Sequence, residues 1–256
     1  MPKYTCFSKI LKYQTMTKKF MFVCMLSTCF LLNKAYAQQQ NTLTDQEKKD
    51  GWQLLFDGKD LKGWHSFQED SAGKSWQVQD GVIALIKNSK TKPADCRDLI
   101  TDQAYDNFDF KVEWQETPGS NSGVMFYVQE DAKYHDTYET GPEMQITDLY
   151  VDGDSRINKC RAGDLYDLVP ADTEWVTVGG KWNLYEIKSQ NGHLQFFQNG
   201  HKIVDTYMWD DNWRKMIAAT KFTAWPDFGT FKKGHISFQG TEYGKLMFRN
   251  IKIRQL

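Results

Sequence analysis

Residues 184–205, LYEIKSQNGHLQFFQNGHKIVD, contain three short runs separated by two Asn-Gly pairs. Asn-Gly is the pair most typical of a two-residue β-hairpin turn, because both positions need a positive φ. The runs between the pairs are too short for stable helices, and they are rich in the aromatic and β-branched residues that favour strands. The segment therefore predicts three consecutive antiparallel strands.

Similar segments recur along the chain. SWQVQDGVIALI (75–86) is divided by an Asp-Gly pair, and FDFKVEW (108–114) alternates apolar and charged residues. Only TDQEKKDG (44–51), with Thr44 as N-cap and Glu47 completing a capping box, and DDNWRKMIA (210–218) resemble helices. Many short strands joined by turn signals predict an all-β fold, a sandwich or jelly roll of two antiparallel sheets.

Residues 1–37 have the features of a signal peptide. They contain six Lys and no Asp, Glu or Arg, and they include the apolar run FMFVCMLSTCFLLN (20–33). The following KAYAQ supplies small residues for cleavage after Ala37, which predicts export to the periplasm or the medium. The alternatives are an uncleaved anchor and lipoprotein processing at Cys29. Residues 38–49 are expected to form a polar tail and residues 50–256 a single β-sandwich domain without a transmembrane segment.

Cleavage would leave a chain with 26 Lys and Arg against 33 Asp and Glu, a net charge of −7. Such a chain is a poor binder of nucleic acid or anionic membranes. Its only cysteines are Cys96 and Cys160, which an oxidising compartment permits to pair, although the sequence does not show that they are close enough. Two cysteines without a CxxC or HExxH motif do not make a four-ligand zinc site.

A candidate site lies in TGPEMQITD (140–148), which is predicted to be a strand. Side chains alternate between the faces of a strand, so Met144 and Ile146 should enter the core while Glu143 and Gln145 lie on the other face. If that sheet curves, its concave side is a groove in which a carboxylate and an amide can meet a sugar. The alternative is an ordinary solvated strand face.

Other residues are placed by the pattern near such a groove. His135 precedes the strand and could overhang it. Trp64 and Trp225 are expected in loops, where an indole ring can stack on a sugar, although aromatic residues pack a sandwich core equally well.

Glu143 and Asp148 have the spacing E-x-Q-x-x-D, which resembles the E-x-D-x-x-E motif of jelly-roll glucanases with an amide in the middle position. Positions five apart on a strand are about 16 Å apart at the backbone. A retaining glycosidase needs its two carboxyl groups about 5–5.5 Å apart and an inverting one about 6.5–9.5 Å. The spacing therefore does not favour hydrolysis by this pair.

Eight blocks of the chain, in order, resemble the 3-keto-disaccharide hydrolase family. They are DGWQLLFDGKDLKGWH (50–65), RDLITDQAYDNFDFKVEW (97–114), NSGVMFYV (121–128), YETGPEMQITD (138–148), AGDLYDLVP (162–170), KWNLYEIKSQNGHLQFFQNGHKIVD (181–205), ATKFTAWPDFG (219–229) and MFRNIKIRQL (247–256). The resemblance implies a concanavalin A-like lectin/glucanase sandwich with a concave groove, and export by glycan-degrading bacteria. The implied activity is cleavage of glycosides oxidised to a ketone at sugar C3.

That activity needs one base, because a C3 ketone acidifies the C2 hydrogen and the resulting enolate can expel the group at C1 before hydration. A carboxylate or His suffices as the base, and an amide, Arg or metal suffices for the oxyanion. The resemblance implies a site containing Glu143 and Gln145. It also implies substrate-binding roles for Arg97, Asn121, Asp164 and Tyr166 and makes Asp148 a candidate second acid or metal ligand. Whether a divalent metal, calcium or a transition metal, takes part is open.

The chain departs from the family in one block. The family often has LQDHG before its last strand, whereas SFQGTEYGKLMFRN (237–250) contains no His. Two interpretations follow: Glu242 or His135 substitutes for that His, or the activity has changed. We expect an exported enzyme whose partner is a carbohydrate or glycoside, with the oligomeric state undetermined. The alternatives are a non-catalytic carbohydrate-binding sandwich, which needs only aromatics and amides, and a conventional glycosidase.

Overall fold

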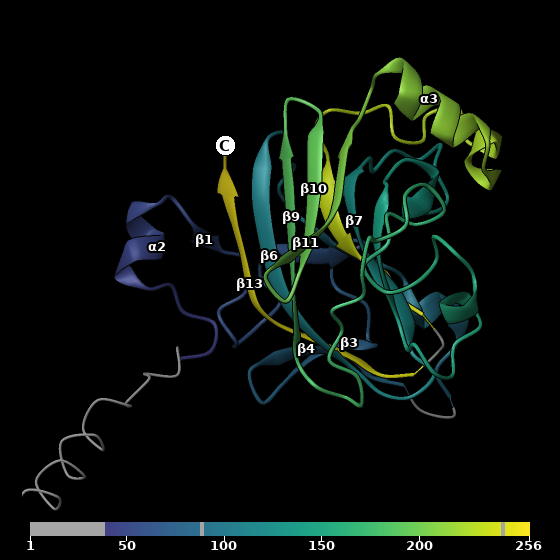
Figure 1. Ribbon diagram of the computed structural model, residues 1–256. Helices are drawn as coiled ribbons and strands as arrows, with labels where there is room; N and C mark the ends of the chain where they lie inside the picture. The colour runs from purple at the N-terminus through teal and green to yellow at the C-terminus, as the bar shows by residue number, and fades with distance from the viewer. Residues whose placement is uncertain (1–38, 88–89, 242–243) are drawn as a thin grey trace, which may run out of the picture. The chain divides into compact units, whose positions relative to one another are not determined.

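The computed structural model describes residues 39–87, 90–241 and 244–256 (Figure 1). The predicted signal peptide and Glu242 lie outside the described residues. All elements considered below belong to one compact unit, Gln40–Leu256. No helix in the described part of the chain is long and apolar enough to cross a membrane.

The larger of two antiparallel sheets has the strand order β11-β10-β9-β6-β13-β4-β3, with β1 pairing beside the end of β13. Figure 1 shows β6, β9, β10 and β13 lying side by side. The strands of this sheet are β1 (Gln53–Leu54), β3 (Trp76–Gln79), β4 (Val82–Leu85), β6 (Phe108–Glu116), β9 (Asn183–Gln190), β10 (His193–Gln198), β11 (His201–Tyr207) and β13 (Leu246–Gln255).

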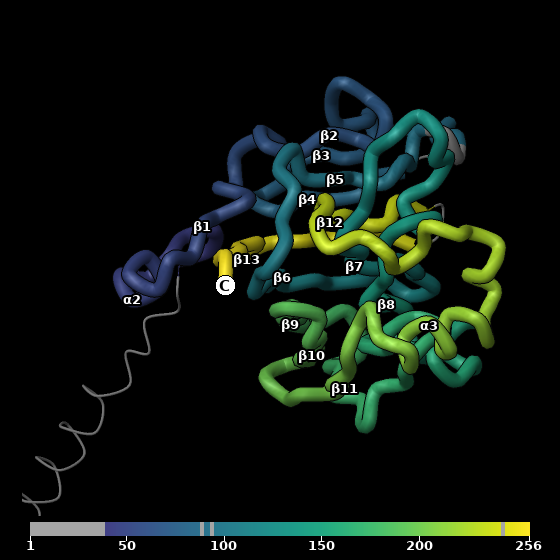
Figure 2. The backbone as a smooth tube through the Cα atoms, turned by 90° about the horizontal axis from the view of Figure 1, so that it is seen from above, coloured from purple at the N-terminus to yellow at the C-terminus, as the bar shows by residue number. Residues whose placement is uncertain are grey.

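The smaller sheet has the order β2-β5-β12-β7-β8 and is seen from above in Figure 2. Its strands are β2 (Trp64–Ser66), β5 (Leu99–Thr101), β7 (Asn121–Val128), β8 (Glu143–Thr147) and β12 (His235–Phe238). Two antiparallel sheets packed face to face confirm the predicted all-β sandwich.

The predicted hairpin turns join strands of the larger sheet. Asn191 and Gly192 have φ of 51° and 87° and connect β9 to β10, and Asn199 and Gly200 have φ of 50° and 84° and connect β10 to β11. Positive φ at both central residues is the backbone that Asn-Gly favours, and its twist matches that of the paired strands. The local sequence therefore sets the register of three neighbouring strands.

The core lies between the two sheets. Phe108, Phe110, Val112 and Trp114 of β6 are fully buried on one face, as the alternation predicts. They belong to one apolar cluster with residues of the smaller sheet, including Phe126 of β7. This packing fixes which face of each strand of the smaller sheet points away from the core.

The two predicted helices are present. α2 (Asp45–Lys49) has the Thr44–Glu47 capping box, and α3 (Asp211–Ala218) has Asp210 as its N-cap. The described residues also contain four short 3₁₀ segments: η1 (Pro93–Cys96), η2 (Thr137–Glu139), η3 (Asp154–Arg156) and η4 (Lys221–Ala224).

The stretch before residue 50, expected to be a polar tail, instead packs on the sandwich. The backbone N–H of Asn41 donates to Asn250 Oδ1 at 2.6 Å, and Glu47 forms an ion pair with Lys252 of β13. Both views show α2 near the C-terminal end of β13 (Figures 1 and 2). The ordered unit therefore begins about ten residues earlier than the sequence suggested.

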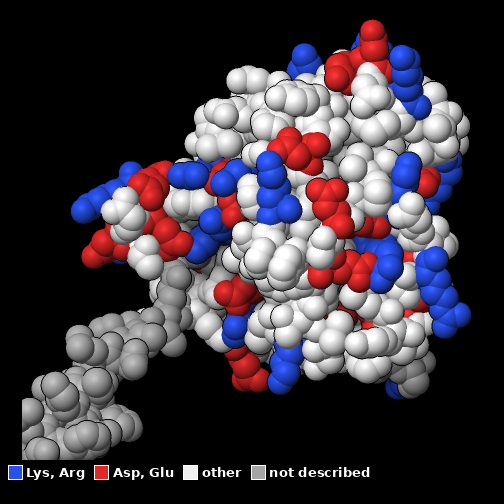
Figure 3. Space-filling model, viewed as in Figure 1, with Lys and Arg blue, Asp and Glu red and all other residues white. Residues whose placement is uncertain are grey.

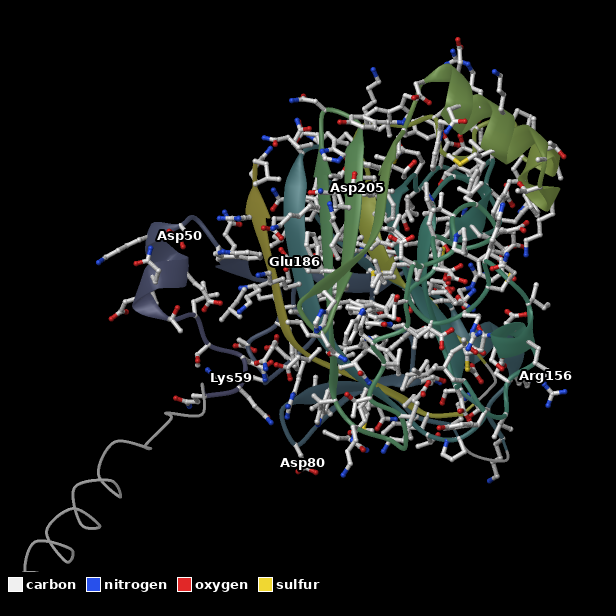
Figure 4. The ribbon with its side chains drawn as sticks, in the orientation of Figure 1. Asp50, Lys59, Asp80, Arg156, Glu186 and Asp205 are labelled. Atoms are coloured by element: carbon white, nitrogen blue, oxygen red, sulfur yellow. The ribbon has the colours of Figure 1, made fainter. Side chains whose placement is uncertain are left out.

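Charges of both signs are interspersed on the face seen in Figure 3. Many are paired: Glu186, labelled in Figure 4 and lying on the larger sheet, has Lys188 Nζ at 2.7 Å and Lys111 Nζ at 3.3 Å. That face offers no extended basic surface for a polyanion, in keeping with the acidic composition.

Candidate functional site

A cavity of about 290 Å³ lies on the face of the smaller sheet that points away from the core. Its volume is at the lower end of the range typical of small-molecule sites. Residues from β7 and β8 form its floor, and the segments around η2, η3, η4 and the end of β12 form its walls. The lining residues are Asn121, Tyr138, Glu143, Gln145, Asp154, Tyr166, Lys221, Phe222, Trp225 and Gln239.

β8 holds Glu143 and Gln145 in this cavity. Met144 and Ile146, between and beyond them, are fully buried in the sandwich core, as predicted. Residues 163–166 bond to the other edge of β8: the Gln145 N–H donates to Asp164 O at 3.0 Å. Both edges of β8 are thus paired, and the carboxylate and the amide stand on a fixed backbone.

The face carrying these two residues is not a solvated strand face. Glu143 is 8% exposed and Gln145 is 1% exposed. An acid and an amide buried together without an Arg or Lys in direct contact cost free energy, and such arrangements concentrate at functional sites.

Gly123 on β7 makes room for the carboxyl group of Glu143. In the pairing of β7 with β8, Gly123 lies opposite Gln145, and Met125 lies opposite Glu143. Both pairs are on the same face of the sheet. A Cβ atom at position 123 would lie only 1.7 Å from Glu143 Oε1 and 2.5 Å from its carboxyl carbon. The absence of a side chain there is therefore a condition for the observed position of Glu143.

Burial raises the pKa of Glu143 to about 8. The negative charges of Asp98 and Asp154 act in the same direction, and the positive charge of Lys221 opposes them. A carboxyl group in this range takes up and releases a proton near neutral pH, which a general base or acid requires.

Amide groups surround the carboxyl. Asn121 Nδ2 donates to Asp152 Oδ1 and to Asp154 Oδ2, both at 3.1 Å. In the orientation that satisfies its surroundings, the Gln145 amide nitrogen donates to Ser122 O at 3.0 Å and to Glu143 Oε1 at 3.1 Å. These hydrogen bonds fix the orientation of the Asn121 and Gln145 side chains on the floor of the cavity.

The loop containing η3 brings Asp154 into the site. Asp154 begins η3 and lines the cavity, whereas Arg156 at its end is exposed and points outward (Figure 4). The Tyr166 hydroxyl lies 3.4 Å from Asp154 Oδ2, and burial raises the pKa of Tyr166, so this phenol keeps its proton.

Lys221 and three aromatic rings form the opposite walls. Lys221 Nζ donates to the Tyr166 hydroxyl at 3.3 Å and stands 4.5 Å from the centre of that ring. The rings of Tyr138 and Trp225 meet edge to face at 5.2 Å, next to Phe222. An aromatic wall beside polar groups is a common design for binding a sugar, whose faces are apolar and whose edges carry hydroxyls.

The structure brings five of the predicted residues together in this cavity: Glu143, Gln145, Asn121, Tyr166 and Trp225. Trp64 does not. It lies on β2 and not in a loop, it is buried, and its Nε1 donates to Leu55 O at 2.6 Å while its ring stacks on Phe238. The loop placement was wrong because a three-residue strand gives too short a pattern to distinguish it from a loop.

Arg97 and His135 line a neighbouring cavity of about 260 Å³ together with Asp98. Arg97 is exposed and its Nε lies 3.5 Å from Glu69 Oε1. The backbone N–H of His135 donates to Glu139 Oε1 at 3.0 Å, and its side chain is exposed. The structure therefore does not bring either residue into the Glu143 cavity.

Two of the predicted acidic residues stabilise loops by accepting hydrogen bonds from backbone N–H groups. Asp164 accepts hydrogen bonds from the backbone N–H groups of Arg161 at 2.8 Å and Ala171 at 2.7 Å, and so shapes the segment that pairs with β8. Asp148 accepts from the N–H groups of Gly119 at 2.7 Å and Tyr150 at 2.9 Å and does not line the cavity. Glu143 and Asp148 therefore do not face a common space.

Among the described residues, no three His, Cys, Asp or Glu side chains are arranged to hold a metal ion. The two described cysteines are buried free thiols: Cys96 Sγ is 3.8 Å from Ser75 Oγ, and Cys160 is hydrogen-bonded to Tyr166. The pairing that the sequence left open is absent from the structure.

Several cavity residues were not singled out from the sequence: Tyr138, Asp154, Lys221, Phe222 and Gln239. Lys221 and Phe222 lie within ATKFTAWPDFG, from which only Trp225 was selected. Asp154 lies in VDGDSRIN, a carboxylate-rich loop. The available signal was a cluster of charged and aromatic residues in loops, but nothing local shows that these loops converge on β8.

A model of the 3-keto-alpha-glucoside-1,2-lyase-like domain matches residues 51–254. A 3-keto-disaccharide hydrolase of Bacteroides thetaiotaomicron is 28% identical over 244 residues, which are 86% of this chain and 83% of that protein.

Two solved structures of Parabacteroides distasonis proteins, both named provisionally as glycosyl hydrolases, are also similar. The first is 32% identical with a TM-score of 0.77 and covers 85% of this chain and 100% of its own. The second is 26% identical with a TM-score of 0.60 and covers 80% of this chain and 99% of its own.

Proposed function

The chain belongs to the 3-keto-alpha-glucoside-1,2-lyase-like family, and we propose that it cleaves glycosides whose sugar carries a ketone at C3. The observation that carries this proposal is the buried Glu143, whose pKa of about 8 suits proton transfer, in a cavity of sugar-binding character. The names of the relatives, a 3-keto-disaccharide hydrolase and glycosyl hydrolases, support the substrate class.

In the proposed reaction the ionised Glu143 removes the C2 proton, and the electron pair of the C–H bond forms an enolate with the C3 ketone. The enolate then re-forms the ketone, and the bond between C1 and the leaving oxygen breaks. The product is an unsaturated ketone and the free aglycone. Addition of water across C1 and C2 gives the 3-keto sugar. One base therefore suffices, and the reaction asks for no nucleophilic role of Asp154, the other carboxylate in the cavity lining.

The developing negative charge on the C3 oxygen needs a donor. Lys221 Nζ is a cavity group able to donate to it, whereas both N–H groups of Asn121 and of Gln145 already donate to neighbouring oxygens. The Tyr166 phenol, which keeps its proton because burial raises its pKa, is placed between Lys221 and Asp154 and can protonate the leaving oxygen. Gln239 occupies the segment in which the family often carries His, so this chain supplies an amide there.

The two alternatives fit the site less well. A binding module needs aromatics and amides but gains nothing from burying a carboxyl group that resists ionisation. A conventional glycosidase needs two carboxyl groups on either side of the scissile bond. Asp148 is committed to two backbone N–H groups outside the cavity, and Asp154, which does line it, accepts from Asn121 Nδ2 and lies beside the Tyr166 hydroxyl.

The substrate class is tested by incubating the purified protein with the 3-keto and the unoxidised form of one disaccharide. We expect aglycone release from the 3-keto form and none from the unoxidised form. Release from the unoxidised form alone would exclude the proposal, and binding of both without release would favour the carbohydrate-binding alternative.

Trp225→Ala should raise KM by about tenfold with kcat changed much less, because the ring packs on bound sugar and takes no part in proton transfer. Trp175→Ala is the matched control, since Trp175 is an exposed Trp that does not line the cavity. A KM unchanged in Trp225→Ala, or raised equally in both variants, would remove Trp225 from the sugar-binding wall.

We also propose that the protein is exported with loss of residues 1–37, a proposal supported by the basic and apolar character of that segment. Sequencing the N-terminus of the exported protein should give Gln38 as the first residue. An acylated N-terminal Cys29 would instead establish lipoprotein processing.

A further inference from the structure

Asp98 joins two walls of the Glu143 cavity without lining it. Its carboxylate, just before β5, accepts hydrogen bonds from Thr137 Oγ1 and from the Gly240 N–H, the latter at 2.7 Å. Thr137 is followed by Tyr138, and Gly240 is preceded by Gln239, and both of these neighbours line the cavity. One side chain therefore fixes the positions of two segments that are more than one hundred residues apart.

The contact at Gly240 leaves no room for adjustment. A Cβ atom at this position would lie 1.9 Å from Cys96 O and 2.8 Å from Arg97 O. The backbone after Gln239 thus packs directly on the backbone before Asp98, and the carboxylate completes that contact from the side of η2. This arrangement is a built junction between the Glu143 cavity and the neighbouring one, which Asp98 and Thr137 line.

The charge of Asp98 also reaches Glu143. Burial raises the pKa of Asp98 to about 6, with Asp136 acting in the same direction and the hydrogen bonds from Thr137 and Gly240 opposing. The groups acting on Glu143 are, besides its burial, Asp98, Asp154 and Lys221. Because Asp98 ionises at the lower pH, it is already negative when Glu143 titrates. Its negative charge therefore raises the pKa of Glu143.

We propose that Asp98 is a positioning residue of this site, which ties the Tyr138 and Gln239 walls together and sets the pH range in which Glu143 ionises. The inference rests on the proposed function only in taking Glu143 as the group that transfers the proton. The position and the charge of Asp98 stand independently of the substrate.

Asp98→Asn is the test, because asparagine keeps the shape, accepts from the Gly240 N–H through its oxygen and can donate to Thr137 Oγ1, but carries no charge. The rise of kcat/KM with pH should move to lower pH by about one pH unit. Asp102→Asn removes a negative charge from an exposed residue just after β5 and should leave the profile where it was.

Thr137 provides a second route if Asp98→Asn fails to fold. Thr137→Val removes the hydroxyl that ties η2 to Asp98 but leaves the charge of Asp98 in place, so KM should rise while the pH at which kcat/KM rises stays unchanged. Thr137→Ser keeps a hydroxyl and should retain the original KM. An unchanged KM in Thr137→Val, or an unchanged pH profile in folded Asp98→Asn, would overturn the inference.

A titration that needs no substrate separates this inference from the proposed function. The carbon-13 signal of the Glu143 carboxyl, identified by its loss in Glu143→Gln, should titrate at lower pH in Asp98→Asn. If Glu143→Gln is fully active, the proposed function fails but this titration still decides the role of Asp98. An unchanged Glu143 titration in folded Asp98→Asn would reject the role.

Discussion

Glu143→Gln should lower kcat by about 10² to 10⁴, because the variant keeps the shape and hydrogen-bonding capacity of the side chain but cannot accept the C2 proton. The loss should appear in kcat more than in KM, since the amide can still contact a sugar hydroxyl. In the unaltered protein kcat/KM should rise with pH through about 8, the pKa of the carboxyl that must be ionised to act as base.

The same variant should be more stable than the unaltered protein at neutral pH. Unfolding returns the Glu143 pKa from about 8 to its ordinary value of 4.5, so the unfolded chain binds fewer protons between these values. The free energy of unfolding therefore falls as pH rises from about 4.5 to about 8, by on the order of 3 kcal/mol up to pH 7 from this group. Glu143→Gln removes this fall in the free energy of unfolding. Melting temperatures of both proteins at pH 5 and pH 7.5 measure the difference.

Glu69→Gln is the matched control, because Glu69 is half exposed and does not line the Glu143 cavity. It should leave kcat and the pH dependence of stability unchanged. Full activity of Glu143→Gln with an unaltered melting temperature would mean that Glu143 neither transfers a proton nor resists ionisation.

Gly123→Ala should reduce kcat by about 10²-fold or more. The added methyl would lie 1.7 Å from Glu143 Oε1, so the carboxyl group must move or β7 and β8 must separate. Displacing a reacting group by about 1 Å can cost this factor even when the group itself is intact. Gly123→Ala tests the position of the Glu143 carboxyl group, whereas Glu143→Gln tests its charge.

Gly153→Ala supplies the comparison for Gly123→Ala. Gly153 precedes Asp154, has an αR backbone, and would place a Cβ in open space. It should be nearly as active and as stable as the unaltered protein. If Gly123→Ala were equally active, the close approach of Glu143 to β7 would have no bearing on catalysis.

The fold followed from the sequence where the cause is local. Asn191-Gly192 and Asn199-Gly200 need only their own backbone preferences to form hairpins, and alternation along β8 sends Met144 and Ile146 to the core. Glu143 and Gln145 were placed correctly by the same alternation. The burial of these two side chains was not foreseen, because it depends on loops that cover β8.

The rest of the site is assembled by loops that are distant in sequence. Lys221, Asp154 and Tyr138 reach Glu143 from three separate segments, and no spacing rule links them. Trp64 was misplaced for a related reason: a three-residue strand at the edge of a sheet leaves too short a pattern to distinguish it from a loop. Arg97 and His135 line the neighbouring cavity and not that of Glu143. Asp98 and Thr137, which lie at the junction of the two cavities, separate them from Glu143.

The central claim, that Glu143 removes the C2 proton of a 3-keto glycoside, is tested most directly by a competition between two forms of one 3-keto disaccharide, with hydrogen or deuterium at C2. Breaking the C2–H bond makes the deuterated form react more slowly, so the remaining substrate should become enriched in deuterium as cleavage proceeds. An unchanged ratio of the two forms throughout cleavage would contradict C2 proton removal and point to direct displacement at C1.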